Sequence, residues 1–213
     1  MATSCCPAWH SMIEKLYPGE MDKISMTLTP MVFTARLMKK EYPGCKVVFV
    51  GPCAAKKLEA IRADIRSDVD FVLTFEELQG MFEAKEVDFK SIPVEDEVPM
   101  NKASAVARNF AVGGGVAAAV VEAAKHLAPE REVKVVAAQG LSECKKMLML
   151  AKAGKYNGYL LEGMCCPGGC VAGAGTIQPI KKSAAAVGLY SKEAPFESAL
   201  QSEYDITLPL LKD

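Results

Sequence analysis

Short apolar, β-branched runs that alternate with helical patterns constrain this chain more than any other feature. Residues 46–50 (KVVFV) pass through a Gly-Pro-Cys break into a helical pattern, and residues 133–138 (VKVVAA) pass through Gln-Gly into another. Residues 70–74 (DFVLT) precede the helical pattern of residues 75–85, and residues 159–162 (YLLE) run into a cysteine-rich segment. This alternation predicts an α/β fold in which mostly parallel sheets are flanked by helices. Ligands of such sheets bind at loops beyond the carboxyl ends of strands.

Helical patterns also fill the regions around the predicted sheets. A first helix is expected to begin at Pro7 and a second to run from about residue 30 to 42. Another is expected after Cys53, and its apolar face would hold Leu58, Ile61 and Ile65. Residues 86–101 contain prolines and an acidic run, and they predict a surface connection.

Composition limits the classes of protein. A chain of 213 residues that is 50% apolar predicts one domain over residues 1–213, with two lobes of about 1–130 and 131–213 as a further subdivision. The 25 basic and 26 acidic residues are balanced, which argues against binding to nucleic acid or an anionic membrane. The longest apolar stretch, residues 110–121, is about half the ~20 residues that a membrane span needs.

The N-terminus lacks the basic start and apolar run of a signal peptide, so we expect a cytoplasmic protein. In that setting the 8 cysteines indicate reduced thiols used for metal binding or catalysis rather than a disulfide framework. Cys45 and Cys144 have the surroundings of small buried hydrophobic residues. The other six fall in three groups, and in each group a proline adjoins a cysteine: Cys5-Cys6-Pro7, Pro52-Cys53 and Cys165-Cys166-Pro167-Gly168-Gly169-Cys170.

The third group has the spacing of a metal-binding helix start. If Pro167 is the first helical residue, Cys166 and Cys170 lie one turn apart, with Cβ atoms roughly 5–6 Å apart. That separation suits two corners of an iron–sulfur cube, and the two glycines let the backbone come close to it. A zinc site and redox-active thiols are the alternatives, although paired zinc knuckles are missing.

Three segments, in this order over about 170 residues, together resemble the catalytic domain of the [FeFe]-hydrogenases. They are TSCCPAW at residues 3–9, PCAAKKLE at residues 52–59 and GMCCPGGCVAGAG at residues 163–175. The resemblance implies the fold of the iron-only hydrogenase large-subunit catalytic domain, without the segment that usually precedes TSCCP. It also implies the H-cluster, a [4Fe-4S] cube joined through a cysteine to a diiron unit with CO, cyanide and azadithiolate.

Residue by residue, the resemblance implies that the cube ligands are Cys6, Cys53, Cys166 and Cys170, of which Cys170 bridges to the diiron unit. It makes Cys5 the proton-transfer thiol, with a packed thiol as the alternative. It places Lys56 on a cyanide ligand, with a solvated surface lysine as the alternative. Met164 would pack beside the cluster, and Pro52 and Gly169 belong to the cofactor-binding motifs.

Three further residues carry weaker expectations. Ser25 has the family's spacing from Cys6 for a hydroxyl in the proton path, although an isolated serine usually caps or turns the chain. Glu59 would line the surroundings of the cluster, or form an exposed helical salt bridge. Gly114, in the middle of three glycines, would border the diiron pocket, or permit close helix packing.

The implied activity is the reversible reduction of protons to H2 with electrons from ferredoxin or a partner subunit, after maturases have supplied the cofactor. Gly51, Cys165 and the sequence GAGT stand where methionine, alanine and GGGQ are common, which is typical of divergent members, some thought to be sensory. The alternatives are an H2-sensing subunit with little turnover and a cluster-assembly protein that holds the cube alone. Cys5, Lys56 and Cys170 together favour a diiron site.

Overall fold

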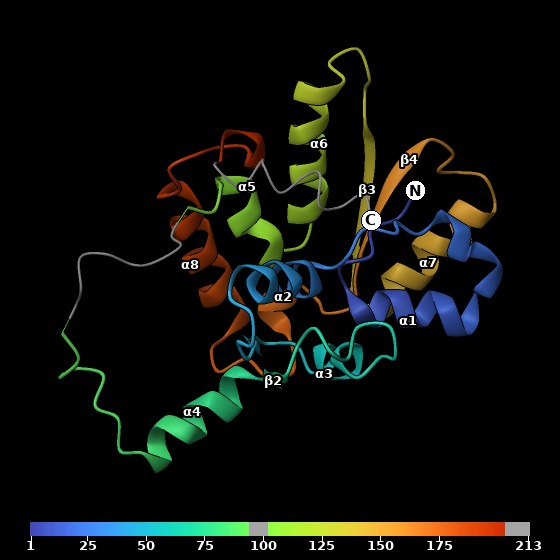
Figure 1. The fold of residues 1–213 in the computed structure, drawn as a ribbon. Helices are drawn as coiled ribbons and strands as arrows, with labels where there is room; N and C mark the ends of the chain where they lie inside the picture. Colours follow the sequence, from blue (N-terminus) through green and yellow to red (C-terminus); the bar gives the residue numbers. More distant parts are fainter. Residues whose placement is uncertain (94–101, 203–213) are drawn as a thin grey trace.

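Two separate parallel sheets organise the protein in a computed structural model that describes residues 1–93 and 102–202 (Figure 1). Strand β1 (Val48–Val50) pairs with β2 (Phe71–Leu73), with Val48 opposite Phe71. Strand β3 (Lys134–Gln139) pairs with β4 (Tyr159–Met164), with Lys134 opposite Tyr159. The prediction of an α/β fold with parallel strands is confirmed.

The β3–β4 sheet carries the first hydrophobic core. Helix α6 (Gly115–Leu127) lies on one side of this sheet, and α7 (Leu141–Lys152) lies on the other (Figure 1). The start of the chain joins the same sheet, because Ala2 bridges to Leu161 and the Thr3 N–H donates to the Leu161 carbonyl at 2.9 Å. The core residues are mainly those of α1 and α7, namely Ala2, Trp9, Met12, Ile13, Ile24, Ala138, Cys144, Met147, Leu148 and Leu161.

Helix α1 (Pro7–Leu16) begins at the predicted proline, whose missing N–H costs nothing in the first turn. Trp9, Met12 and Ile13 are buried as expected, whereas Leu16 at the last helical position is exposed. The Trp9 indole donates to the Thr3 carbonyl at 3.1 Å, which fixes the turn that carries Cys5 and Cys6.

The predicted lobes of about 1–130 and 131–213 stay a prediction.

The β1–β2 sheet carries the second core. Helix α2 (Pro30–Glu41) is capped by the Thr29 hydroxyl and contributes Met31, Val32 and Ala35 to this core. The other buried members are Ala60, Ile65 and Val69, and Phe49 of β1 and Val72 of β2 pack against them. Helix α3 (Ala55–Ala60) is shorter than predicted, and the expectation for its apolar face is wrong. Ile65 is buried, but Leu58 and Ile61 are 68% and 70% exposed, because Lys56, Glu59 and Ala60 occupy the inward face of the helix.

The other helices complete the fold around these sheets. A capping box of Thr74 and Glu77 begins α4 (Phe75–Ala84), which buries none of its residues and lies at the edge of the molecule (Figure 1). The remaining elements are α5 (Ala105–Arg108), α8 (Ile180–Lys192), η1 (Pro18–Lys23), η2 (Asn109–Ala111), η3 (Cys170–Ala172) and η4 (Ala199–Gln201).

The predicted connection at residues 86–101 has no helix or strand up to residue 93, and its remainder lies outside the described residues. Within residues 1–93 and 102–202, no helix is long and apolar enough to cross a membrane.

Candidate metal centre

Three loops bring the cysteine groups to one region of the molecule. Cys53 follows β1, residues 165–170 follow β4, and Cys5 and Cys6 precede α1. All of these cysteines are free thiols and all are partly buried. Two of the loops thus leave the carboxyl ends of parallel strands, where α/β proteins place their ligand sites.

The thiols of the four predicted cube ligands lie within electrostatic range of one another. Burial, together with Cys53, Cys6, Cys5 and Cys166, raises the pKa of Cys170 to about 12. The pKa of Cys166 is likewise raised by burial and then by Cys53 and Cys6. Thiols from residues more than 160 positions apart in the chain therefore lie near one another.

The donor set of this pocket fits an iron–sulfur cube. Across the described ranges, no three His, Cys, Asp or Glu side chains converge on one point as ligands of a single ion would. A [4Fe-4S] cube takes one thiolate at each iron, so its four ligands surround a volume rather than a point. An all-thiolate set drawn from three loops meets that requirement.

The loop between Cys166 and Cys170 differs from the prediction. Residues 165–169 form bends and turns, and a short 3-10 helix begins only at Cys170, so the expected helix from Pro167 is wrong. The reason lies in the two glycines, whose φ angles of 99° and 93° are incompatible with a right-handed helix. Cys166 and Cys170 therefore do not lie in the first turn of an α-helix.

Close backbone contact explains why Gly169 has no side chain. A Cβ at this position would lie 2.6 Å from the Gly113 nitrogen and 2.8 Å from the Ala111 oxygen. The Gly113 N–H also donates to the Gly168 carbonyl at 3.1 Å. Residues 111–113 thus lie directly against the cysteine loop. The prediction that the two glycines let the loop backbone come close to an iron–sulfur cube stays a prediction.

Pro52 joins the second cysteine motif to the third. Its carbonyl accepts a hydrogen bond from the Gly175 N–H at 2.9 Å. A Cβ on Gly173 would lie 2.2 Å from the same oxygen. These contacts hold Cys53 and Cys170 in a fixed relation, whatever group their thiols bind.

Glu162 is a site residue that the sequence analysis missed. It is fully buried in β4, and its carboxylate accepts from the Gly114 N–H at 2.7 Å and from the Ala117 N–H at 2.6 Å. These amides belong to the first turn of α6, where unpaired N–H groups and the helix dipole favour an anion. A glutamate within the otherwise apolar YLLEGM was the available signal.

The three glycines at residues 113–115 serve close packing. Gly114 has a φ of 89° and donates to Glu162, and a Cβ on Gly115 would lie 1.9 Å from the Asn109 carbonyl. These contacts support the packing interpretation of this segment. The role of Gly114 beside a diiron unit stays a prediction.

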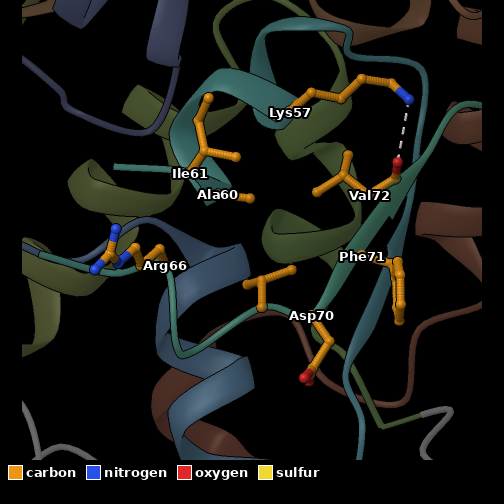
Figure 2. Close-up of a pocket in the computed structure, with 8 residues that line it drawn as sticks. Lys57, Ala60, Ile61, Arg66, Asp70, Phe71 and Val72 are labelled. Atoms are coloured by element: carbon orange, nitrogen blue, oxygen red, sulfur yellow. Dashed lines mark hydrogen bonds between the residues drawn. The ribbon is translucent and has the colours of Figure 1, made fainter. Parts of the chain in front are cut away.

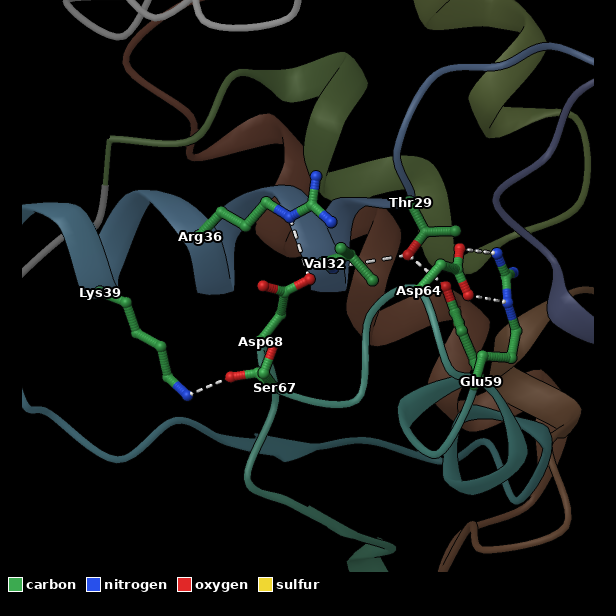
Figure 3. A network of polar contacts seen from close by, with 9 residues as sticks. Thr29, Val32, Arg36, Lys39, Glu59, Asp64, Ser67 and Asp68 are labelled. Carbon is green, nitrogen blue, oxygen red and sulfur yellow. Dashed lines mark hydrogen bonds and ion pairs between the residues drawn. The ribbon is translucent and has the colours of Figure 1, made fainter. Parts of the chain in front are cut away.

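A buried ion pair lies on the inward face of α3. The Lys56 ammonium donates to Glu59 at 2.6 Å, and the Thr29 hydroxyl donates to the other Glu59 oxygen at 2.6 Å. Figure 3 shows Glu59 and Thr29 meeting from α3 and from the start of α2. Lys56 and Glu59 are only 7% and 2% exposed, so the surface alternatives for both residues are wrong. The neighbouring Lys57 is the partly exposed one, and it pairs with Glu77.

Cys5 lies between opposite charges. Its pKa is raised to about 11 by burial, by Cys6 and by Glu162, and it is lowered by Lys56. Burial is the largest of these causes, so the thiol keeps its proton at neutral pH. A neutral, partly buried thiol within electrostatic range of the Lys56 ammonium suits a proton carrier, although a packed thiol would have the same charge state.

Two other predicted residues have defined positions. Met164 ends β4 and is 2% exposed, and its carbonyl accepts from the Gly140 N–H at 2.8 Å. The Ser25 hydroxyl donates to the Thr27 hydroxyl at 3.0 Å and accepts from the Thr27 N–H at 3.3 Å. These contacts support the turn interpretation of Ser25, and its place in a proton path stays a prediction.

A hollow of about 300 Å³ lies apart from the predicted site residues (Figure 2). Figure 2 shows Ile61 and Ala60 of α3 at one side and Phe71 and Val72 of β2 at the other. Its remaining lining residues are Lys57, Arg66, Val69 and Asp70. None of the predicted cluster ligands contributes to this hollow.

The fold and the site together define an α/β domain with two parallel sheets. Its thiols gather where loops from both sheets meet the start of the chain. Residues 1–174 match the sequence profile of the family described as iron only hydrogenase large subunit, C-terminal domain, and the chain belongs to that family. A variant of the apo [FeFe]-hydrogenase HydA1 from Chlamydomonas reinhardtii has the same fold, with a TM-score of 0.73 at 23% identity over 98% of this chain and 71% of that chain.

Curated relatives carry more than one functional description. The periplasmic [Fe] hydrogenase large subunit of Nitratidesulfovibrio vulgaris is 30% identical over 84% of this chain and 51% of its own length. A probable cytosolic Fe-S cluster assembly factor of Aedes aegypti is 26% identical over 84% of this chain and 47% of its own length. The chain thus spans about half the length of these relatives. It is a hydrogenase-like domain from a family that binds iron–sulfur clusters.

Proposed function

We propose that this chain is the catalytic part of an [FeFe]-hydrogenase and binds the H-cluster. The thiolates of Cys6, Cys53, Cys166 and Cys170 would hold the [4Fe-4S] cube, and Cys170 would also join the diiron unit with CO, cyanide and azadithiolate. The observation that carries this proposal is that the four thiols, from three loops far apart in the chain, lie near one another. Family membership supports the choice of cofactor.

When bound, the H-cluster supplies the reversible interconversion of protons and electrons with H2. The residues of the chain bind it, keep water out and move the proton. Cys5 would carry the proton, because its partly buried thiol stays neutral and has an S–H to donate. Lys56 would offer an ammonium donor to an anionic cyanide ligand, and Glu59 would hold that ammonium in place.

The remaining site residues would shape the pocket. Met164 would pack beside the cluster, and Gly169 and Gly114 would let backbone approach it. Pro52 would fix the Cys53 loop through its bond to Gly175. Ser25 would pass protons toward Cys5 from the outside. These roles rest on the family motifs and on the positions described above.

The proposed partners are ferredoxin or an electron-transfer subunit, which would deliver electrons, and the maturases that build the H-cluster. We propose a cytoplasmic location. We also propose that neither nucleic acid nor a membrane is a partner, because the basic and acidic residues are balanced. The activities of the longer relatives are assigned to this chain only as part of this proposal.

A cluster-assembly protein that holds only the cube is the second candidate, because the Aedes aegypti relative carries that description. The burial of Lys56 near Cys5 favours the diiron site, since a cube needs neither residue as a ligand. A sensory subunit would hold the same cofactor and differ in turnover.

The test is an anaerobic assay of H2 evolution with reduced methyl viologen on protein produced with the maturases. Wild type should evolve H2, and Cys5→Ser should lose at least about 100-fold of the rate, because a positioned acid contributes about that much. Cys45→Ser, at a partly buried cysteine before β1 whose thiol donates to the Met38 carbonyl, should retain the rate. Wild-type protein with four irons and no H2 evolution would support the assembly or sensory candidates instead.

A further inference from the structure

The Thr29 hydroxyl makes a hydrogen bond that its position as a helix cap does not explain. As the cap of α2 it accepts from the Val32 N–H at 3.5 Å, which is long for a hydrogen bond. It also donates to a carboxylate oxygen of Glu59 at 2.6 Å, a length typical of an O–H bond to a charged acceptor (Figure 3). A cap needs only the acceptor side of a hydroxyl, so the donor side serves a second contact.

Glu59 divides its two carboxylate oxygens between two donors. One oxygen accepts from the Thr29 hydroxyl, and the other accepts from the Lys56 ammonium, also at 2.6 Å. All three residues are buried, where bonds to a charged group are stronger than in water. An ammonium carries three protons, and a carboxylate that offers it a single oxygen takes one of them. The hydroxyl of Thr29 thus limits how much of the Lys56 ammonium Glu59 occupies.

This contact joins elements that belong to the first two cysteine motifs. The Lys56 N–H donates to the carbonyl of the proposed ligand Cys53 at 3.3 Å, so the lysine lies in the turn that follows that cysteine. The Ser4 hydroxyl donates to the Thr27 carbonyl at 2.9 Å, which ties the segment before Thr29 to the first motif. The side chain of Thr29 therefore reaches from the first motif to the residues that hold Lys56 in the second.

We propose that Thr29 is a positioning residue for Lys56: its hydroxyl occupies one oxygen of Glu59 and thereby keeps the ammonium available to the cyanide ligand. The inference rests on the proposed function, in which Lys56 donates to that ligand. Without the hydroxyl, one buried carboxylate oxygen loses its donor, which is costly. The carboxylate then turns both oxygens to the ammonium, and the bond from Lys56 to the ligand weakens.

The stretching frequency of the cyanide reports this bond directly. A hydrogen bond to the nitrogen of a metal-bound cyanide raises the C–N frequency, because it draws on a nitrogen lone pair that is weakly antibonding between the two atoms. Loss of the bond therefore lowers the frequency. A role of Thr29 in folding alone would leave the frequency unchanged.

The experiment is infrared spectroscopy of the reconstituted protein after the diiron unit is introduced, with the iron content of the cube measured first. Thr29→Val replaces the hydroxyl by a methyl group of similar size. It should keep the iron content of wild type and show a cyanide band at lower frequency. Thr29→Ser restores the hydroxyl and should return the band to the wild-type position. If Thr29→Val takes up no iron, Thr29→Gly is measured in its place and should show the same shift, because glycine caps a helix nearly as well as threonine.

Thr74→Val is the matched control. Thr74 is also a buried threonine that caps a helix, and its hydroxyl accepts from the Glu77 N–H at 3.2 Å at the start of α4. This variant loses a cap of the same kind and should show the cyanide bands of wild type.

The outcomes separate this inference from the function on which it rests. Wild-type protein without CO or cyanide bands would overturn the proposed function and the role of Thr29 with it. Wild-type bands together with an unchanged cyanide frequency in Thr29→Val would overturn the role of Thr29 alone. An equal shift in Thr74→Val, or no recovery in Thr29→Ser, would assign the shift to something other than the bond to Glu59, and the inference would be equally wrong.

Discussion

Replacement of Glu162 by glutamine should destabilise the protein through one buried contact. The carboxylate accepts from two amides of α6 at 2.7 and 2.6 Å and has no access to solvent. Glutamine keeps one acceptor oxygen and presents an NH2 group to the second amide. One charge-assisted bond of about 1.5–3 kcal/mol is lost and one N–H is left unpaired, so we expect a loss of roughly 2–4 kcal/mol in the free energy of unfolding.

Urea unfolding of the iron-free protein measures this loss. Trp9 is the only tryptophan, is fully buried and faces Gly163, whose Cβ would lie 2.3 Å from the indole ring, so its fluorescence reports on the β4 region. Glu143→Gln is the control, because Glu143 is exposed and its lysine partner is 3.9 Å away. A Glu162→Gln protein within about 0.5 kcal/mol of wild type would refute the argument that this carboxylate fastens α6 to the cysteine-bearing strand.

Three further substitutions test other parts of the structure. Gly169→Ala should reduce both stability and iron content, since its Cβ would meet the Gly113 nitrogen at 2.6 Å, whereas Gly158→Ala, at φ 79° in open space, should cost only about 1–2 kcal/mol by urea unfolding. Glu59→Ala should lower the free energy of unfolding by about 3–5 kcal/mol, because it leaves the buried Lys56 unpaired; a loss below 1 kcal/mol would contradict this. The pKa of Asp70 is held below its usual range by Lys39, then by the Val47 amide and Lys46, so its carboxylate stabilises the fold above about pH 4 and loses that effect as the pH falls further. Asp70→Asn should therefore be less stable than wild type at pH 7, and the difference should narrow in unfolding curves taken below about pH 4.

Local patterns in the sequence predicted most of the fold. The parallel strands, the start of α1 at Pro7 and the extent of α4 followed from periodicity and proline placement. The apolar face of α3 was wrong because an ion pair, which hydrophobic periodicity does not register, occupies the inward positions. The helix at Pro167 was wrong because proline also suits a turn, and Gly-Gly permits the positive φ angles that such a turn needs.

The parts of the candidate site that lie in sequence motifs could be predicted. The parts that depend on contacts between distant residues could not. The three cysteine groups were evident from their prolines, and the structure brings them together. Glu162 was missed because its partners are amides about 45 residues earlier in the chain.

Infrared spectroscopy tests the central claim most directly. The protein is first reconstituted with iron and sulfide, and the diiron unit is then introduced by the maturases or as a synthetic complex under anaerobic conditions. The account predicts CO and cyanide stretching bands in wild type, and loss of those bands in Cys170→Ala but not in Cys45→Ala. Four bound irons without any CO or cyanide bands would contradict an H-cluster at this site.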